Sequence, residues 1–159
     1  MAMEKTLVII KPDAVARRYM GKILSRFEEK GLVVSAMRMM MVTKEIAEKH
    51  YAEHNGKPFY PGLVSFITSG PVVVMALEGL EAIAVVRKMV GATNGRAAEP
   101  GSIRGDFGMS KGYNLIHASD SPESAEKELN LYFTAADYMP APKQESLSWN
   151  YEFGPNGAV

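Results

Sequence analysis

Four stretches of this chain have the apolar, β-branched composition that is typical of β-strands. Residues 6–10 read Thr-Leu-Val-Ile-Ile, which predicts a central strand. Residues 32–42 contain methionines that are compatible with a helix or a strand, but the preceding Gly31 and the length favour a long strand. Residues 71–77 and 114–117 give two further strands.

Between these stretches, apolar residues recur at the three- or four-residue spacing of one helix face. Met20, Ile23, Leu24 and Phe27 follow this spacing and predict a helix that ends at Lys30 and Gly31. Thr43 is a predicted N-cap for a helix over 43–53, and two further helices are predicted over 63–68 and 80–90. Residues 91–112 contain many glycines and predict a long loop.

A final helix is predicted after residues 119–121, which are all of types favoured at helix N-caps, with Pro122 at the first helical position. Ala125, Leu129 and Tyr132 share one face of that helix, and Glu128 borders the same face.

This order of elements predicts an α+β fold, a ferredoxin-like sandwich in which helices cover one face of a four-stranded antiparallel sheet. The last helix and a C-terminal tail are additions to that pattern. We expect a single domain over residues 1–153 and a flexible tail over 154–159.

Composition narrows the possible functions. The 159 residues carry a net charge of zero, so nothing indicates a dedicated nucleic-acid or membrane partner. The absence of cysteine excludes disulfides and thiol chemistry. No apolar run reaches the length of a membrane span and the N-terminus has no signal-peptide pattern, so we expect a cytoplasmic protein.

The main chemical candidate is the pair of His117 and Glu128. His117 ends a predicted strand, and a carboxylate near the buried helix face needs a hydrogen-bond partner, which the imidazole would supply. The alternative is a surface histidine near an unrelated surface glutamate, and this stretch alone leaves both open.

A metal site is a weaker hypothesis. His50, Glu53 and His54 match the H-x-x-E-H pattern of inverted zinc peptidases. Packing with Ile46 also explains the two histidines and is the favoured interpretation, because the helix ends at once and a third ligand would have to be a distant carboxylate. The Asp-Phe-Gly at 106–108 lacks the other protein-kinase motifs.

Several cations and polar side chains lie at the predicted ends of elements, where they could form a polyphosphate pocket with an imidazole at its end. Each taken alone is more simply a solvated surface residue. The set comprises Lys11, Arg87, Thr93, Arg104 and Asn114.

Four blocks of this sequence resemble the signature blocks of the nucleoside diphosphate kinase family, in the same order and spacing. The block 114–121, Asn-Leu-Ile-His-Ala-Ser-Asp-Ser, is the most specific. The others are Lys-Pro-Asp-Ala from Lys11, Gly-Ala-Thr-Asn from Gly91, and Pro-Gly-Ser-Ile-Arg-Gly-Asp-Phe from Pro100. The likeness extends over residues 4–151.

The resemblance implies ping-pong transfer of the γ-phosphoryl group from a nucleoside triphosphate, usually ATP, to nucleoside diphosphates. His117 would be the phosphorylated nucleophile, and Glu128 would orient its ring. Phe59 would stack on the base. The residues around phosphates and ribose would be Lys11, Tyr51, Arg87, Thr93, Arg104 and Asn114. The resemblance also implies Mg²⁺ carried on the nucleotide phosphates, no protein-ligated metal, and a homo-oligomer, a hexamer.

Four residues depart from the family pattern: Gly95 replaces a proline, Lys111 an apolar residue, Tyr113 an arginine and Ala118 a glycine. Gly95 predicts weaker assembly than in relatives, because glycine adds backbone freedom. Lys111 stands where relatives have an apolar residue that closes over the base opposite the phenylalanine. The alternative reading is a regulatory module that binds nucleotide without turnover.

Overall fold

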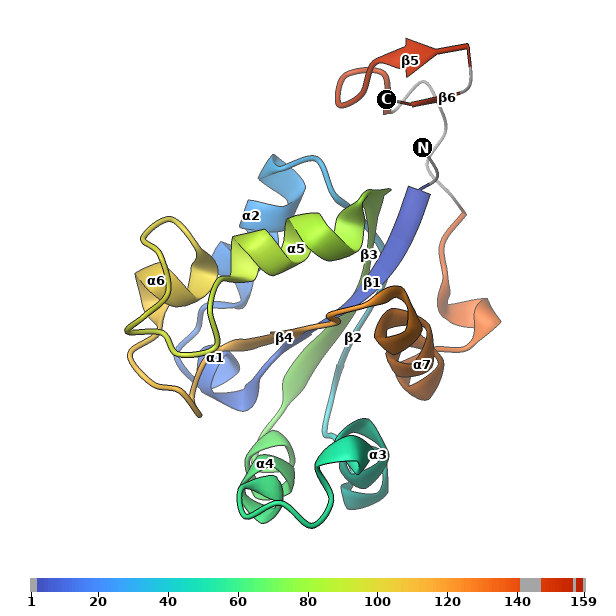
Figure 1. Ribbon diagram of the computed structural model, residues 1–159. Helices are drawn as coiled ribbons and strands as arrows, with labels where there is room; N and C mark the ends of the chain where they lie inside the picture. Colours follow the sequence, from blue (N-terminus) through green and yellow to red (C-terminus); the bar gives the residue numbers. More distant parts are fainter. Residues whose placement is uncertain (1–2, 141–146, 156, 159) are drawn as a thin grey trace.

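A four-stranded antiparallel sheet, in the order β2–β3–β1–β4, is the centre of the fold (Figure 1). The computed structural model describes residues 3–140, 147–155 and 157–158. The strands are β1 (Met3–Ile10), β2 (Val33–Met40), β3 (Val72–Leu80) and β4 (Ile116–Ala118). The α+β, ferredoxin-like prediction is confirmed.

Helices cover both faces of the sheet, which corrects the expectation of one covered face. Within β1, Val8 and Ile10 belong to one apolar cluster, and Leu7 and Ile9 to the other. Both faces of this central strand are therefore apolar and must be covered. The first face carries α1 (Pro12–Ala16), α2 (Met20–Glu29) and α5 (Ala82–Val90), and the second carries α3 (Lys44–His50), α4 (Tyr60–Ile67) and α7 (Pro122–Tyr132).

The helix ends follow the predicted capping chemistry. The Ile46 amide donates to Thr43 at the start of α3, and the Ser124 amide donates to Ser121 at the start of α7. Gly31 has a φ of +96° just beyond α2, a conformation that glycine adopts without strain.

Other boundaries differ from the sequence prediction. β4 begins at Ile116 rather than at residue 114, because the buried Leu115 adopts a φ of +73° and breaks the strand. The predicted loop 91–112 contains α6 (Ile103–Phe107), which begins where the Gly105 amide donates to Ser102. Short 3₁₀ turns occupy Ala52–His54 and Ala135–Asp137.

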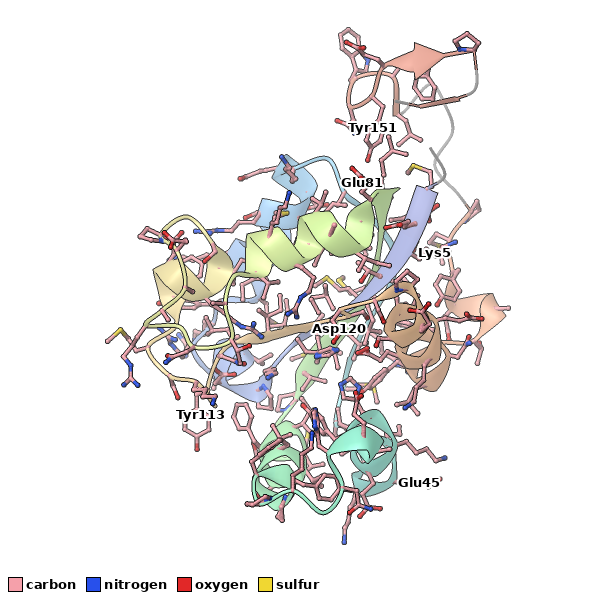
Figure 2. The ribbon with its side chains drawn as sticks, viewed as in Figure 1. Lys5, Glu45, Glu81, Tyr113, Asp120 and Tyr151 are labelled. Atoms are coloured by element: carbon pink, nitrogen blue, oxygen red, sulfur yellow. The ribbon has the colours of Figure 1, made fainter. Side chains whose placement is uncertain are left out.

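Near the C-terminus, β5 (Phe153–Gly154) pairs with β6 (Gly157–Ala158) as a small hairpin. The Leu80 amide at the end of β3 donates to the Tyr151 hydroxyl at 3.3 Å, and Figure 2 places Tyr151 close to Glu81. The mobility predicted for residues 154–159 and the single domain over 1–153 stay predictions, and residues 1–2, 141–146, 156 and 159 lie outside the described residues. Among those described, no helix is both long and apolar enough to cross a membrane.

Gly95 has a structural role within its own loop, and the weaker assembly expected from the sequence stays a prediction. A Cβ at this position would lie 2.4 Å from the carbonyl oxygen of Gly108, and the Gly95 amide donates to the Ser110 carbonyl at 3.2 Å. Proline would add the carbon and remove the donor, so in this loop it is the destabilising residue.

We expect Gly95→Pro to lower the free energy of unfolding by roughly 2–4 kcal/mol, from the backbone clash and the lost hydrogen bond. Differential scanning calorimetry would measure this as a Tm about 5–15 °C lower. Gly21→Ala is the matched control, because a Cβ there meets nothing within 4 Å. A higher Tm for Gly95→Pro would contradict this account of the loop.

Candidate functional site

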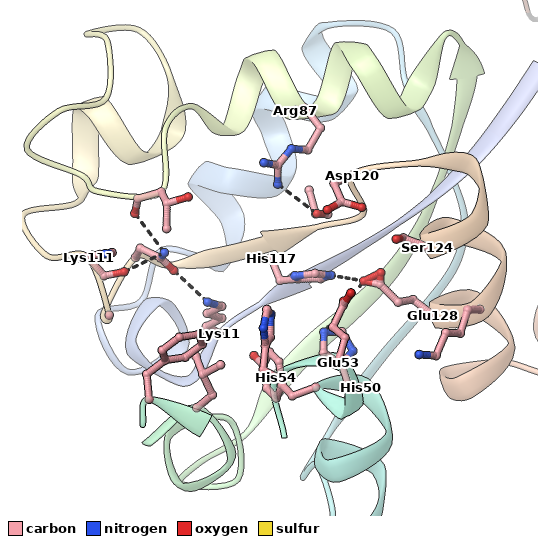
Figure 3. A pocket seen from close by; sticks show the side chains of 18 of the residues that line it. Lys11, His50, Glu53, His54, Arg87, Lys111, His117, Asp120, Ser124 and Glu128 are labelled. Carbon is pink, nitrogen blue, oxygen red and sulfur yellow. Dashed lines mark hydrogen bonds and ion pairs between the residues drawn. The ribbon is translucent and has the colours of Figure 1, made fainter. Parts of the chain in front are cut away.

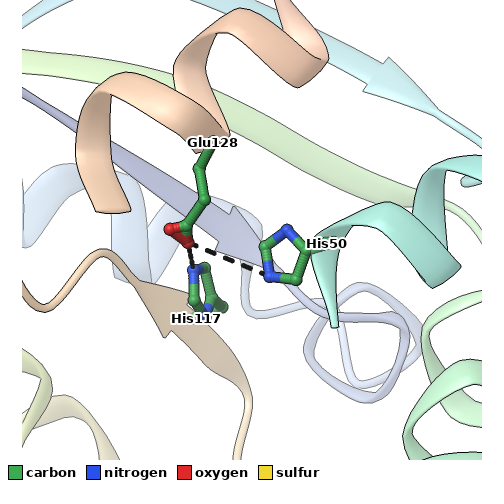
Figure 4. Close-up of side chains that lie close together, drawn as sticks. All are labelled: His50, His117 and Glu128. Carbon is green, nitrogen blue, oxygen red and sulfur yellow. Dashed lines mark hydrogen bonds and ion pairs between the residues drawn. The ribbon is translucent and has the colours of Figure 1, made fainter. Parts of the chain in front are cut away.

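His117 lies on the sheet face that carries α3 and α7. In the antiparallel pairing of β1 with β4, His117 is opposite Ile9, whose side chain belongs to the cluster on that face. Its Nε2 is hydrogen-bonded to Oε1 of Glu128 on α7 (Figures 3 and 4). The Ser119 hydroxyl donates to the other carboxylate oxygen of Glu128 at 3.2 Å. The pairing of His117 with Glu128 is thus an observed contact, and the surface-residue alternative is wrong.

This contact determines which ring nitrogen is available. With Nε2 donating its hydrogen to the carboxylate, Nδ1 of His117 carries a lone pair. Burial, followed by the charges of Lys11 and Arg104, lowers the pKa of His117 to about 3. Burial also raises the pKa of Glu128. The imidazole is therefore neutral, and it is oriented as a nucleophile at neutral pH.

A cavity of about 720 Å³ opens in front of His117. All nine residues that the sequence suggested for the site line this cavity. They are Lys11, Tyr51, Phe59, Arg87, Thr93, Arg104, Asn114, His117 and Glu128.

Lys11 and Asn114 form the floor of the cationic end. The Lys11 amine donates to the side-chain oxygen of Asn114 at 2.8 Å. The Asn114 amide in turn donates to the carbonyls of Thr93 and Lys111, both at 3.0 Å. Burial, followed by the charge of Arg104, lowers the pKa of Lys11 to about 8, so the amine is still mostly charged at pH 7. Asn114 therefore links the loop 91–112 to the amine.

Arg104 is held rigidly by backbone carbonyls. Its guanidinium donates to the carbonyls of Asn114 at 3.1 Å, Gly91 at 3.2 Å and Ile116 at 2.5 Å. Burial lowers its pKa to about 10, which leaves the charge intact at neutral pH. Arg87 donates to the Ala118 carbonyl at 3.2 Å, as the dashed line in Figure 3 shows. Two oriented guanidiniums and one amine thus surround the space near His117.

Two apolar side chains also line the cavity. Phe59, half-exposed at 52%, and Leu63 come from the start of α4. Lys111 lines the same cavity from the loop before β4, so the aliphatic part of its side chain is available to cover a flat ligand. Burial raises the pKa of Tyr51 to about 12, so its hydroxyl stays protonated and can donate.

The structure also adds residues that sequence reasoning missed. Ser119 is buried and bonded to Glu128, which the N-cap interpretation of residues 119–121 did not anticipate. His50, which the sequence suggested as a packing residue or a metal ligand with His54, lies against His117 with ring centroids 4.6 Å apart. The adjacency of His50 to Tyr51 was the available signal, since α3 brings both to the cavity.

The H-x-x-E-H hypothesis grouped His50 with His54, and the structure groups His50 with other residues. Ligand atoms of His50, His117 and Glu128 lie within 4.8 Å of one another, whereas His54 is partly buried outside this group and contacts Lys57 at 3.1 Å. The nearest pair in this group, His117 and Glu128, is joined by a direct hydrogen bond. The predicted H-x-x-E-H pair therefore does not form a site.

Comparison with known proteins agrees with this geometry. The family model described as nucleoside diphosphate kinase matches residues 4–138. Nucleoside diphosphate kinase from Rhodopirellula baltica is 60% identical over 136 residues, covering 86% of this chain and 90% of the relative. The nucleoside diphosphate kinase from Archaeoglobus fulgidus is 52% identical, and the match covers 94% of this chain and 99% of the relative.

Solved structures give the same result. A nucleoside diphosphate kinase from Halobacterium salinarum, in complex with CDP, superimposes with a TM-score of 0.91 at 45% identity. The match covers 95% of this chain and 100% of that one. The Aquifex aeolicus nucleoside diphosphate kinase gives a TM-score of 0.84, also at 45% identity. That match covers 87% of this chain and 100% of the Aquifex chain.

Proposed function

Because this chain belongs to the nucleoside diphosphate kinase family, we propose that His117 is the residue that carries the phosphoryl group between nucleotides. The enzyme transfers phosphoryl groups between nucleotides, from a nucleoside triphosphate to a diphosphate, by the ping-pong route through phosphohistidine that is general for the family. The observation that supports His117 is its hydrogen bond to Glu128, which leaves Nδ1 free beside three cations.

In the first half-reaction, Nδ1 of His117 attacks the γ-phosphorus, the bond from phosphorus to the bridging oxygen breaks, and the diphosphate leaves with the electron pair. The ring keeps its hydrogen on Nε2 and becomes cationic, and the Glu128 carboxylate balances that charge. The second half-reaction reverses these steps with another diphosphate. Such transfer depends mostly on positioning and charge neutralisation.

Lys11, Arg87 and Arg104 would neutralise the phosphates, since they line the cavity and their charges act on His117. The ribose would lie within reach of Asn114, Thr93 and Tyr51. Asn114 would act partly by holding Lys11, to which it is bonded. Phe59 would stack on the base.

Mg²⁺ would enter on the nucleotide phosphates. The exposed carboxylates lining the cavity, Glu53, Asp120 and Glu123, suit a hard cation that keeps most of its water and phosphate ligands. When bound, Mg²⁺ would neutralise phosphate charge. Lys11, Arg87 and Arg104 would orient the phosphate oxygens.

The direct test of the proposed function uses ATP labelled in the γ-phosphoryl group. The label on the protein should be lost in acid and retained in base, as it is for a phosphohistidine. Peptide mapping should place the label on His117. Label that is stable in acid would exclude the mechanism. A regulatory module without turnover would bind ATP but pass no label to a diphosphate.

We expect weak discrimination between bases. Stacking on Phe59 stabilises any of the bases in the same way, because each has an aromatic face. The polar residues of the cavity are assigned to phosphate and ribose. Values of kcat/KM for the diphosphates of adenine, guanine, cytosine and uracil should fall within roughly one order of magnitude, since no base edge is read. Phe59→Ala should lower all four together, by about 1–3 kcal/mol of stacking. A preference of several orders for one base would contradict the assignment.

We further propose a homo-oligomer, a hexamer as the resemblance implies. β2 is an edge strand, and Met37, Met39 and Met41 on and beside it are each at least 54% exposed. Exposed apolar side chains on an unpaired strand favour a protein partner. Light scattering at micromolar concentration should detect the oligomer, and Met39→Lys should weaken it. A stable monomer would overturn this proposal.

A cytoplasmic location is proposed because nucleoside triphosphates are found there.

A further inference from the structure

His50 and Tyr132 form a buried pair next to His117, and the transfer proposed above gives them no role. His50 ends α3 with a side chain 2% exposed, and Tyr132 on α7 is 3% exposed. Nδ1 of His50 and the Tyr132 hydroxyl oxygen are 3.2 Å apart. Figure 4 shows His50 beside Glu128 and His117, with its ring edge against the His117 ring. His50 therefore contacts the reactive His117, and Tyr132 is joined to the site through His50.

The direction of this hydrogen bond follows from the chemistry of both groups. Burial raises the pKa of Tyr132 and lowers the pKa of His50 to about 3, so the phenol keeps its hydrogen and the imidazole is neutral. The Tyr132 hydroxyl has no other hydrogen-bond partner among the residues that the structure describes, so it donates to Nδ1 of His50. The hydrogen of the His50 ring must then be on Nε2.

That hydrogen faces Glu128. Nε2 of His50 is 3.9 Å from Oε1 of Glu128, too far for a hydrogen bond but close enough for attraction between an N–H dipole and a carboxylate. The opposite tautomer would aim a lone pair at the carboxylate. Glu128 is thus approached by three hydrogens, from His117, Ser119 and His50.

We propose that Tyr132 and His50 are positioning residues, which fix the His50 tautomer so that its N–H holds the Glu128 carboxylate against the ring of His117. The inference rests on the proposed function, because it concerns the charge that develops when Nδ1 of His117 attacks phosphorus. As the new bond forms and the bridging bond breaks, the His117 ring becomes cationic and Glu128 must stay ionised and aligned.

A neutral His50 suits this task better than a charged one would. Its ring centroid is 4.6 Å from that of His117, so a second cation there would oppose the charge that forms on His117. The Nε2–H dipole instead attracts Glu128 without adding net charge. Simple packing would require the shape of the His50 ring and no particular tautomer.

Tyr132→Phe isolates the hydrogen bond, because it removes one oxygen from a residue that does not line the cavity. We expect single-turnover phosphorylation by ATP to slow roughly tenfold, the low end of the loss when outer groups that orient a metal-binding imidazole are removed. The dissociation constant for ADP should not change. Tyr151→Phe is the matched control, since it removes a hydroxyl bonded to Leu80 at the far end of β3. The control should lower stability and leave the phosphorylation rate unchanged.

Nitrogen NMR on protein labelled with ¹⁵N-histidine provides the readout that packing alone would not change. The chain has three histidines, so each ring can be assigned. In the parent protein, His50 should be protonated on Nε2; in Tyr132→Phe it should become a mixture of tautomers, with His54 unchanged. His50→Gln, which keeps an N–H near the Nε2 position, should be phosphorylated faster than His50→Leu.

Two results would overturn the inference, and they can be told apart. If the parent is phosphorylated on His117 and Tyr132→Phe reacts within twofold of the parent rate, or keeps the His50 tautomer, the positioning role fails alone. If the parent takes no label on His117, the proposed function fails and this inference fails with it.

Discussion

Replacing His117 with alanine should abolish both phosphoenzyme formation and nucleotide exchange. The neutral ring is the only nucleophile in the proposed mechanism, and removal of a covalent nucleophile typically costs roughly 10⁶-fold in kcat. Incubation with γ-labelled ATP should leave no acid-labile label. Exchange assays should fall to the background rate. ADP binding should persist, since the cationic residues Lys11, Arg87 and Arg104 remain in place.

The fold of His117→Ala should stay intact. The substitution leaves the buried Oε1 of Glu128 without the ring, which costs about 1–3 kcal/mol, but the Ser119 bond to Oε2 remains. Circular dichroism and thermal unfolding would verify this. The parent enzyme should give parallel double-reciprocal lines, as ping-pong kinetics require. Intersecting lines together with an active His117→Ala variant would instead indicate direct transfer between two bound nucleotides.

Glu128→Gln should give the second largest loss, a fall in the phosphorylation rate within the range of about 10²–10⁴-fold or somewhat below it. The amide keeps the size of the side chain but lacks the charge that balances the cationic ring. Its NH₂ group also cannot accept a hydrogen, so either His117 or Ser119 loses its acceptor. Rapid-quench measurement of phosphoenzyme formation would give the rate.

Glu126→Gln is the matched control for this variant, because Glu126 lies on the exposed side of the same helix and is two residues away. The control should phosphorylate at the parent rate. A Glu128→Gln enzyme that also reacts at the parent rate would show that the hydrogen bond to His117 has no part in catalysis, and that ring orientation comes from packing.

The order of strands and helices was predictable because it depends on local patterns. Residues 6–10 and 71–77 are strongly apolar, and they form the two central strands β1 and β3. Thr43 and Ser121 were assigned as caps and accept the amide hydrogens that capping requires. The sheet was expected to be covered on one face only, because periodicity shows that a segment is apolar without showing what lies on each side.

The loop before β4 could not be predicted for a different reason. Leu115 has a φ of +73°, unusual for a bulky residue, and its amide donates to Asp13 at 3.1 Å, 102 residues earlier in the chain. Gly95 looked like a weak point in the sequence, yet its lack of a Cβ lets the loop approach Gly108. Both features depend on contacts between segments that are distant in the sequence.

The sequence by itself determined the residue types of the site. A nucleophilic imidazole, a carboxylate and several cations can be recognised from residue identities and from the spacing of the motifs. The tertiary structure decided their partners. The register of β4 against β1 turns His117 toward α7, and the end of α3 places His50 beside His117. Burial then lowers the pKa of His117 and of Lys11. Desolvation and hydrogen-bond direction depend on three-dimensional neighbours, and no local pattern in the chain contains them.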